Sequence, residues 1–148
     1  MSNRNKTFRT HSLQAAKAES FWQIIEQSGT DYEGAVAMLS EKSLSFIFDF
    51  EEFLAQKLYA LDKKSLAEKI YKDRPVSKDD FLYVRCYTLA QGKTYFEKVL
   101  AGEIPMLNRP FEALLSLSEK AYFRKTNAEM PPFVSSFSYE TGSNREEW

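Results

Sequence analysis

The stretch from Ser77 to Leu100, SKDDFLYVRCYTLAQGKTYFEKVL, decides the fold class of this chain. Its apolar residues recur at intervals of three and four positions, which is the spacing of one face of an α-helix. Ser77 with Asp80 three positions later is typical of a capping pair at a helix start, and Gly92 is expected to kink or divide the helix. One arginine, Arg85, interrupts the apolar side. The stretch therefore predicts architecture more than it predicts a reaction.

The same helical spacing extends to both sides of this stretch. Gly29, the pair Arg74-Pro75 and Gly102 followed by Pro105 are the expected helix stops. The cluster Phe46, Ile47, Phe48 and Phe50 could be mistaken for a strand, but the length of its segment and the acidic interruption at Asp49, Glu51 and Glu52 favour a helix. The sequence therefore predicts an all-α fold of five to six helices, in which further helices run from Ser12 or Ser20 to Gly29, from Asp31 to about Lys42, from Leu44 to Leu61, from Asp62 to Asp73 and from Asn108 to Thr126. Ser12 or Ser20, Asp31, Asp62 and Asn108 are the expected N-caps of their helices.

The length of 148 residues is typical of one domain with a single core. We expect residues 1–11 to be a flexible N-terminal lead-in, residues 12–127 to form one compact helical domain and residues 128–148 to be an extended, irregular C-terminal tail. The tail carries the alternating aromatic residues Phe133, Phe137 and Tyr139. We expect these to dock the tail on its own body, because so many exposed aromatic residues would promote association. The alternative is that the tail offers a peptide-like segment to another chain.

Charge and composition bear on the class of partner. The formal net charge is −1, which gives no overall attraction toward nucleic acid or an anionic membrane. The longest apolar runs, such as Ala35–Leu39, are far too short to cross a bilayer, and the N-terminal stretch lacks the apolar core of a secretory signal. With Cys86 as the single cysteine, no internal disulfide can form. We expect a cytoplasmic protein whose partner is neither nucleic acid nor a membrane.

Arg85 is the first candidate for a functional side chain. It lies four residues after Phe81 and four before Leu89, on an otherwise apolar helix side, where an isolated guanidinium is very costly to bury. It therefore requires a carbonyl or carboxylate partner. A buried pair that fixes how two helices pack is the favoured interpretation, and an anion-binding arginine in a groove is the alternative. The candidate carboxylates are Asp49, Glu52, Asp79 and Asp80.

Clusters of carboxylates invite a catalytic or metal-binding interpretation. Asp49, Glu51 and Glu52 form one cluster, and Asp79 with Asp80 forms another. Neither is accompanied by histidines at metal-ligand spacing, and acidic residues at helix starts and on helix faces are ordinarily caps and solvated charges. We predict no catalytic residue and no metal site from them.

The remaining reactive side chains give equally little indication of chemistry. His11 is the only histidine and lies in a stretch without helical pattern, so we expect it to be solvated. Cys86 shares a helix side with Leu82 and Leu89, so we expect a small core residue and not a reactive thiol. No cofactor is predicted.

The residues described so far also carry a family resemblance. The chain resembles a bacterial family known as domain of unknown function 4240. The resemblance covers most of the chain and implies a mostly helical fold with no known activity. It rests on Phe21-Trp22, on the helix from Leu44 to Tyr59, on the run Ser77, Asp79, Asp80, Phe81, Arg85, Gln91 and Gly92, and on the segment from Tyr95 to Leu100.

The sequence names no reaction, and the leading hypothesis for function is a protein-interaction module. We expect it to bind another protein through the face near Arg85, Tyr83 and Tyr87, because tyrosine anchors partners at low entropic cost. The near-neutral charge and the abundance of aromatic residues agree with this interpretation.

The alternative comes from a different functional class. An enzyme or a small-ligand-binding protein would need a carboxylate and arginine site. In this sequence that site would be built from Asp49, Glu52, Asp80 and Arg85.

Overall fold

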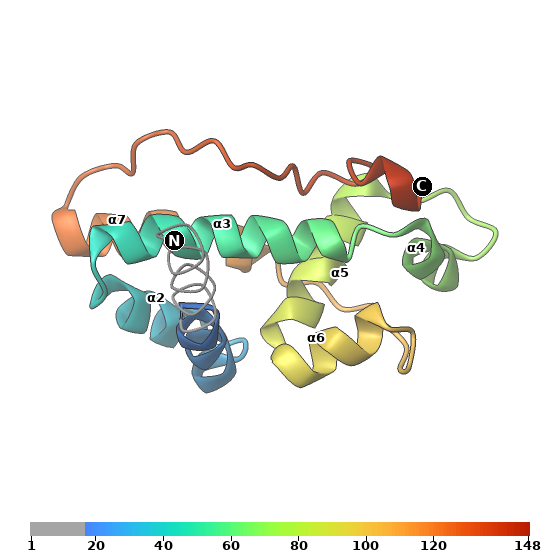
Figure 1. The fold of residues 1–148 in the computed structure, drawn as a ribbon, viewed down its shortest axis with the longest axis horizontal. Coiled ribbons are helices and arrows are strands. Elements are labelled where there is room, and N and C mark those ends of the chain that lie inside the picture. The colour runs from blue at the N-terminus through green and yellow to red at the C-terminus, as the bar shows by residue number, and fades with distance from the viewer. Residues whose placement is uncertain (1–16) are drawn as a thin grey trace, which may run out of the picture.

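The computed structural model describes residues 17–148, which form seven α-helices and two short 3-10 helices and contain no strand (Figure 1). The all-α prediction is confirmed. The helix count exceeds five to six because Gly92 divides the expected Ser77–Leu100 helix. The lead-in and His11 lie outside the described residues. The α-helices are residues 17–28, α2 Tyr32–Ser40, α3 Leu44–Ala60, α4 Lys64–Tyr71, α5 Lys78–Ala90, α6 Lys93–Leu100 and α7 Leu117–Thr126, and the 3-10 helices are η1 Glu112–Ser116 and η2 Arg145–Glu147.

Helix α3 is the axis around which the other elements are arranged (Figure 1). It begins after Ser43, whose hydroxyl accepts a hydrogen bond from the backbone N–H of Phe46 at 3.1 Å. Helices α2 and α7 pack near its N-terminal half, and α5 crosses its C-terminal half. Its buried side, which includes Ile47, Phe50 and Leu58, contributes to a single core.

The core is rich in aromatic residues, as the composition suggests. The ring centroids of Phe21 and Phe53 lie 4.9 Å apart, and those of Trp22 and Phe53 lie 5.2 Å apart. Trp22 also contacts Phe96 of α6, at 5.5 Å between centroids. Residues 17–28 are thereby joined to both α3 and α6, and the Phe21 and Trp22 side chains are buried in the core.

Several predicted helix boundaries are confirmed by their backbone geometry. The Asp31 carboxylate accepts from Gly34 N at 3.1 Å and caps α2. Gly92 has a φ of 107°, which side-chain-bearing residues rarely adopt, and this conformation separates α5 from α6. The N–H of Lys93, just after this turn, donates to the Glu26 carboxylate at 3.1 Å. A residue of the 17–28 helix thus caps α6.

Other predicted caps are wrong. Ser20 lies inside the 17–28 helix and does not start it. Ser77 precedes α5, but its side chain makes no capping hydrogen bond. Asp62 does not cap α4, since Lys63 occupies that position and the Asp62 carboxylate is taken by the C-terminal tail. A capping pattern in sequence is local, and tertiary partners override it here.

The last long helix also begins later than predicted. Asn108 to Phe111 are not helical, and the first helical turn is η1 from Glu112. The cause is a tertiary hydrogen bond in which Phe111 N donates to the Tyr83 carbonyl of α5 at 3.0 Å. This bond holds the loop along α5 and delays the helix. At the other end α7 stops at Asn127, which has the left-handed φ of 57°.

The C-terminal tail returns along α3, over the side opposite α2 (Figure 1). Phe133 packs against Phe48 with 5.9 Å between ring centroids, and Phe137 packs against Tyr59 at 5.2 Å. The backbone N–H of Ser136 donates to the Glu52 carboxylate at 3.1 Å. The tail therefore docks on its own body, as its alternating aromatic residues predict.

Candidate functional site

Arg85 lies in the middle of α5 and is fully buried. Its Nη1 donates to the Leu58 carbonyl at 2.9 Å and its Nη2 donates to the Thr141 hydroxyl at 3.0 Å, while its guanidinium carbon lies 5.0 Å from the centroid of the Phe81 ring. Its Nε is buried without an acceptor. Burial lowers the pKa of Arg85, and the negative charge of Asp62 opposes that shift. The predicted burial and the carbonyl partner are confirmed.

The carboxylates expected to pair with Arg85 lie elsewhere. Among the described residues Arg85 has no ion pair. Asp49 binds Lys17 at 2.8 Å on the surface, and Glu52 accepts from the tail at Ser136. Asp80 lies at the start of α5, where it and Arg74 line an open hollow of about 190 Å³. No hydrogen bond or ion pair in the described structure joins these three carboxylates, or the fourth candidate Asp79, to Arg85.

Asp62 is the residue that sequence reasoning missed. It is fully buried, and both of its carboxylate oxygens accept hydrogen bonds from the tail. Gly142 N donates to Oδ1 at 3.0 Å, Asn144 N donates to Oδ2 at 3.0 Å, and the indole N–H of Trp148 donates to Oδ1 at 2.9 Å. No local pattern indicates this role, because every one of these donors is at least 80 positions away along the chain.

Further contacts complete the attachment of the tail at this place. The Asn144 side-chain amide donates to the Tyr59 carbonyl at 3.2 Å, and the Trp148 indole N–H also faces the Asp62 carbonyl at 3.0 Å. The Trp148 ring meets Phe81 edge-on, with 6.3 Å between centroids. We call residues 141–148 the clasp. Asp62, Phe81 and Arg85 form the surface that receives it.

A second buried polar group lies where α7 packs against α3. Glu51 Oε2 and Ser118 Oγ are both buried, and neither makes a well-directed hydrogen bond. Burial raises the pKa of Glu51, an effect that the nearby Ser118 hydroxyl partly opposes. The Glu51 charge in turn adds to the effect of burial in raising the pKa of Tyr139 from the tail. The carboxylate therefore lies between α3, α7 and the tail.

Tyr83 and Tyr87, the other predicted site residues, lie one turn apart on α5 and are both half-buried. Burial, followed by the charges of Asp79 and Glu112, raises the pKa of Tyr83. On α6, the Tyr95 hydroxyl donates to the Pro105 carbonyl at 3.5 Å. Burial raises the pKa of Tyr95, with a further contribution from Tyr87.

The loop after α6 completes this surface. The backbone of Leu107 lies close enough to the Tyr95 hydroxyl to lower its pKa, and the Leu107 side chain is 44% exposed. We call Tyr83, Tyr87, Tyr95 and Leu107 the tyrosine face. Arg85 supports α5 from inside and does not belong to this surface, which corrects its predicted place beside the tyrosines.

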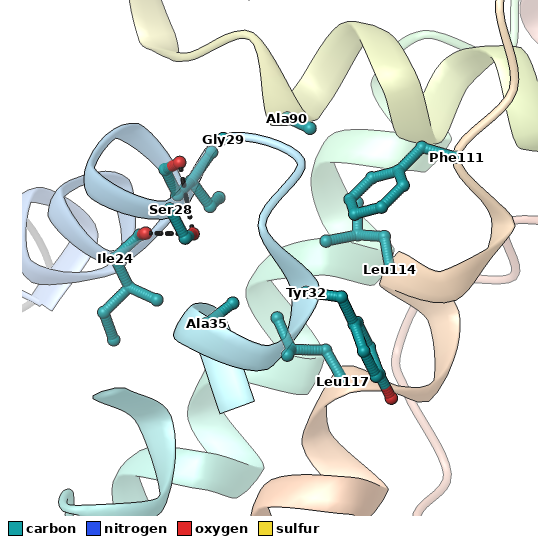
Figure 2. Close-up of a pocket in the computed structure, with 10 residues that line it drawn as sticks. Ile24, Ser28, Gly29, Tyr32, Ala35, Ala90, Phe111, Leu114 and Leu117 are labelled. Atoms are coloured by element: carbon teal, nitrogen blue, oxygen red, sulfur yellow. Dashed lines mark hydrogen bonds between the residues drawn. The ribbon is translucent and has the colours of Figure 1, made fainter. Parts of the chain in front are cut away.

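Figure 2 shows a small cavity between the 17–28 helix, α2, α5 and the η1–α7 region. It has a volume of about 10 Å³, which is at most the space of one water molecule. Its walls are mainly apolar, and the Ser28 hydroxyl beside it donates to the Ile24 carbonyl at 2.6 Å. A larger hollow of about 400 Å³ is open to solvent and is lined by Glu119, Lys120, Phe123, Glu129 and Met130.

Cys86 is buried in α5, as predicted for a core residue. Burial raises the pKa of its thiol to about 12, and the Arg85 charge only partly opposes this. Across residues 17–148 no three His, Cys, Asp or Glu side chains are grouped as metal ligands. The same residues include no helix that is both long enough and apolar enough to span a bilayer.

Comparison with known proteins places the helical body in a family. No curated protein and no solved structure matches the sequence. The family described as protein of unknown function (DUF4240) matches residues 17–124, which include Asp62, Arg85 and the tyrosine face but not the clasp. This match covers well over half of the chain and confirms the resemblance noted from the Phe21-Trp22 and Ser77–Gly92 residues. The chain therefore belongs to the DUF4240 family.

Proposed function

We propose that this chain is a cytoplasmic protein-interaction module that binds a partner protein through the tyrosine face. The observation that carries the proposal is the grouping of three half-buried tyrosines with the exposed Leu107 on one surface. Tyrosine combines a large apolar ring with a polar hydroxyl and has only two side-chain torsions to fix on binding. Such residues dominate the energetics of protein interfaces.

The tyrosine face is held in place before any partner binds. The opposite side of α5 is buried through Phe81, Val84 and Leu89, so the helix that presents Tyr83 and Tyr87 is anchored in the core. The loop that carries Leu107 is tied to this helix where Phe111 N donates to the Tyr83 carbonyl. A preorganised surface loses less conformational entropy on binding than a mobile one.

The charges at the edge of the face indicate the chemistry of the partner. Asp79 and Glu112 lie close enough to Tyr83 to raise its pKa. A partner surface with apolar groups at its centre and Lys or Arg at its edge complements this arrangement. The attraction is local, because the net charge of the whole chain is only −1.

A matched pair of variants tests the proposal. Leu107→Asp places a charge on the tyrosine face, and Phe123→Asp places the same charge on α7, where Phe123 is 51% exposed. Tagged wild-type and variant chains are used to capture proteins from lysate of the source cells. Each captured protein is then purified, and its Kd for the three chains is measured by calorimetry, with circular dichroism as the check on folding.

We expect one captured protein to bind wild type and Phe123→Asp equally, and to bind Leu107→Asp at least about tenfold more weakly, which corresponds to the loss of one good interface contact. A partner that binds all three chains equally, or that is lost with Phe123→Asp alone, would overturn the assignment of the face.

A further inference from the structure

The attachment of the clasp has the features of peptide recognition. The receiving surface presents a buried carboxylate, Asp62, and a buried guanidinium, Arg85. Within the described chain, the hydrogen bonds that the Asp62 carboxylate accepts all come from the clasp. The Arg85 guanidinium donates to two acceptors, of which the clasp supplies one, the Thr141 hydroxyl. Buried charges without hydrogen-bond partners are strongly unfavourable. The clasp therefore both covers these two charges and supplies hydrogen-bond partners that they need while they are buried.

The contacts also specify which segment fits. Thr141 supplies a hydroxyl that accepts from Arg85 and donates to the Lys78 carbonyl at 2.7 Å. Gly142 supplies a φ of 90°, which allows its N–H to reach Asp62. Asn144 and Trp148 supply the amide and the indole N–H described above. Four residues of the clasp sequence Thr-Gly-Ser-Asn-Arg-Glu-Glu-Trp therefore make the specific contacts, namely Thr141, Gly142, Asn144 and Trp148.

The segment that leads to the clasp has a different character. Most of residues 128–138 are exposed, the pair Pro131-Pro132 lies among them, and the Val134 side chain is 91% exposed. The contacts of this connector include ring packing by Phe133 and Phe137, packing of Met130 against the core and the Ser136 to Glu52 hydrogen bond. The connector tethers the clasp, and the clasp carries the specific contacts.

The family match divides the molecule at the same place. It includes Asp62, Phe81 and Arg85 but ends at residue 124, before the connector and the clasp. The receiving surface therefore belongs to the family's helical body, and its occupant is a separate element. Nothing in the contacts of the clasp requires it to come from the same molecule.

We propose that the surface formed by Asp62, Phe81 and Arg85 is a peptide-recognition site, and that it accepts residues 141–148 of a second copy of this chain in place of its own. The same hydrogen bonds form in either arrangement. The clasp of the same chain is tethered to the site at an effective concentration on the order of millimolar. The clasp of a second chain therefore binds mainly when the tethered clasp is weakened or the protein is concentrated. Each exchange joins two copies, and reciprocal exchange closes a symmetric dimer.

Complementation between two full-length variants tests the proposal. Asp62→Asn keeps the shape of the side chain but turns an N–H donor toward the donors of the clasp, so this copy has a defective site and an intact clasp. Trp148→Ala has an intact site and a defective clasp. When the two are mixed, we expect a one-to-one heterodimer by light scattering, and we expect each variant alone to remain mainly monomeric.

The matched control replaces the first copy with the double variant Asp62→Asn, Trp148→Ala, which has no intact clasp to donate. This control should give no heterodimer with Trp148→Ala. If both single variants are folded by circular dichroism and their mixture remains monomeric up to about 1 mM, the concentration set by the tether, exchange is refuted.

A second measurement applies even if the Trp148→Ala chain does not fold alone. A synthetic peptide of residues 138–148 is added to this full-length variant, folded or during refolding, and is compared with the same peptide carrying Trp148→Ala. We expect the wild-type peptide to bind at least about tenfold more tightly and to raise the Tm or the yield of folded chain. Equal effects of the two peptides, or no effect of either, would overturn the recognition site.

Discussion

The Nη2 atom of Arg85 donates to the Thr141 hydroxyl at 3.0 Å, although 56 positions separate the two residues in sequence. The Thr141 hydroxyl donates onward to the Lys78 carbonyl at 2.7 Å. The middle of α5, the start of α5 and the tail are thereby connected through one hydroxyl group. Loss of this connection is expected to weaken the attachment of the tail and the packing of α5 together.

Replacement of the Thr141 hydroxyl is the mildest test of this connection. Thr141→Val keeps the side-chain shape but leaves Arg85 Nη2 without an acceptor, at a cost of about 1–3 kcal/mol in the free energy of unfolding. The control is Thr88→Val. The Thr88 hydroxyl is also buried but donates only to the Val84 carbonyl of its own helix, so we expect a smaller loss, about 1 kcal/mol or less. Equal losses in urea denaturation would contradict a special role for Thr141.

Arg85 itself should be far more sensitive. Arg85→Ala removes a fully buried side chain, its hydrogen bonds to Leu58 and Thr141 and its contact with Phe81, and we expect a loss of about 3–5 kcal/mol or failure to express. Arg124→Ala, an exposed change in the last turn of α7, should cost little. A folded Arg85→Ala chain of unchanged stability would instead support a ligand-binding role for this arginine.

Glu51 gives a prediction about pH. Because burial raises its pKa, the folded chain holds this proton more tightly than the unfolded chain. The contribution of Glu51 to stability is therefore most favourable when it is protonated and falls as the pH rises from the unfolded value of about 4.3 through the raised value. Glu51→Gln cannot ionise, so it removes this loss of stability at high pH. We expect it to stabilise the chain by about 1 kcal/mol at pH 7, and the gain to vanish near pH 4.

Thermal unfolding between pH 4 and pH 8 measures this difference, with Glu68→Gln as the control. Glu68 is exposed on α4 and lies 3.9 Å from Lys64, so its replacement should change stability by only a few tenths of a kcal/mol. A Glu51→Gln chain that is less stable than wild type at pH 7 would show that the charged form of Glu51 is favourable.

The Cys86 thiol provides a probe of the unfolding that exposes α5. Its thiol is buried and has a pKa of about 12, so it should resist a thiol reagent at pH 8 in the folded chain and react fully in denaturant. We expect the labelling rate without denaturant to follow the unfolding equilibrium and to increase in Thr141→Val. Rapid labelling of the folded wild-type chain, as fast as in denaturant, would show that α5 is accessible.

Local chemistry explains which parts of the fold the sequence predicts well. The break at Gly92 depends on backbone conformation at one residue, the cap at Asp31 depends on a hydrogen bond three positions away, and the burial of Cys86 follows from helical spacing. The burial of Arg85 follows in the same way from its place among apolar neighbours. These properties depend on residues within about one helical turn, so the sequence pattern contains them.

Distant contacts explain what the sequence does not predict. Asp62 has the pattern of a helix cap, but its partners are 80 to 86 positions away. The backbone N–H of Phe111 donates to the Tyr83 carbonyl, and the helix predicted from Asn108 begins only at η1. The carboxylates predicted for Arg85 form no hydrogen bond or ion pair with it among the described residues. Choosing among several acidic residues requires the tertiary arrangement, which no local rule supplies.

The position of the clasp also has a consequence for synthesis on the ribosome. The residues that hold Asp62 and Arg85 emerge only after every α-helix from residue 17 to Thr126 has been translated. Until then the Asp62 carboxylate and the Arg85 guanidinium of the nascent helical body lack their partners in the clasp, and the contacts between body and clasp cannot form. A released chain that ends at residue 138 should therefore be protease-sensitive, and the chain that extends to residue 148 should be resistant.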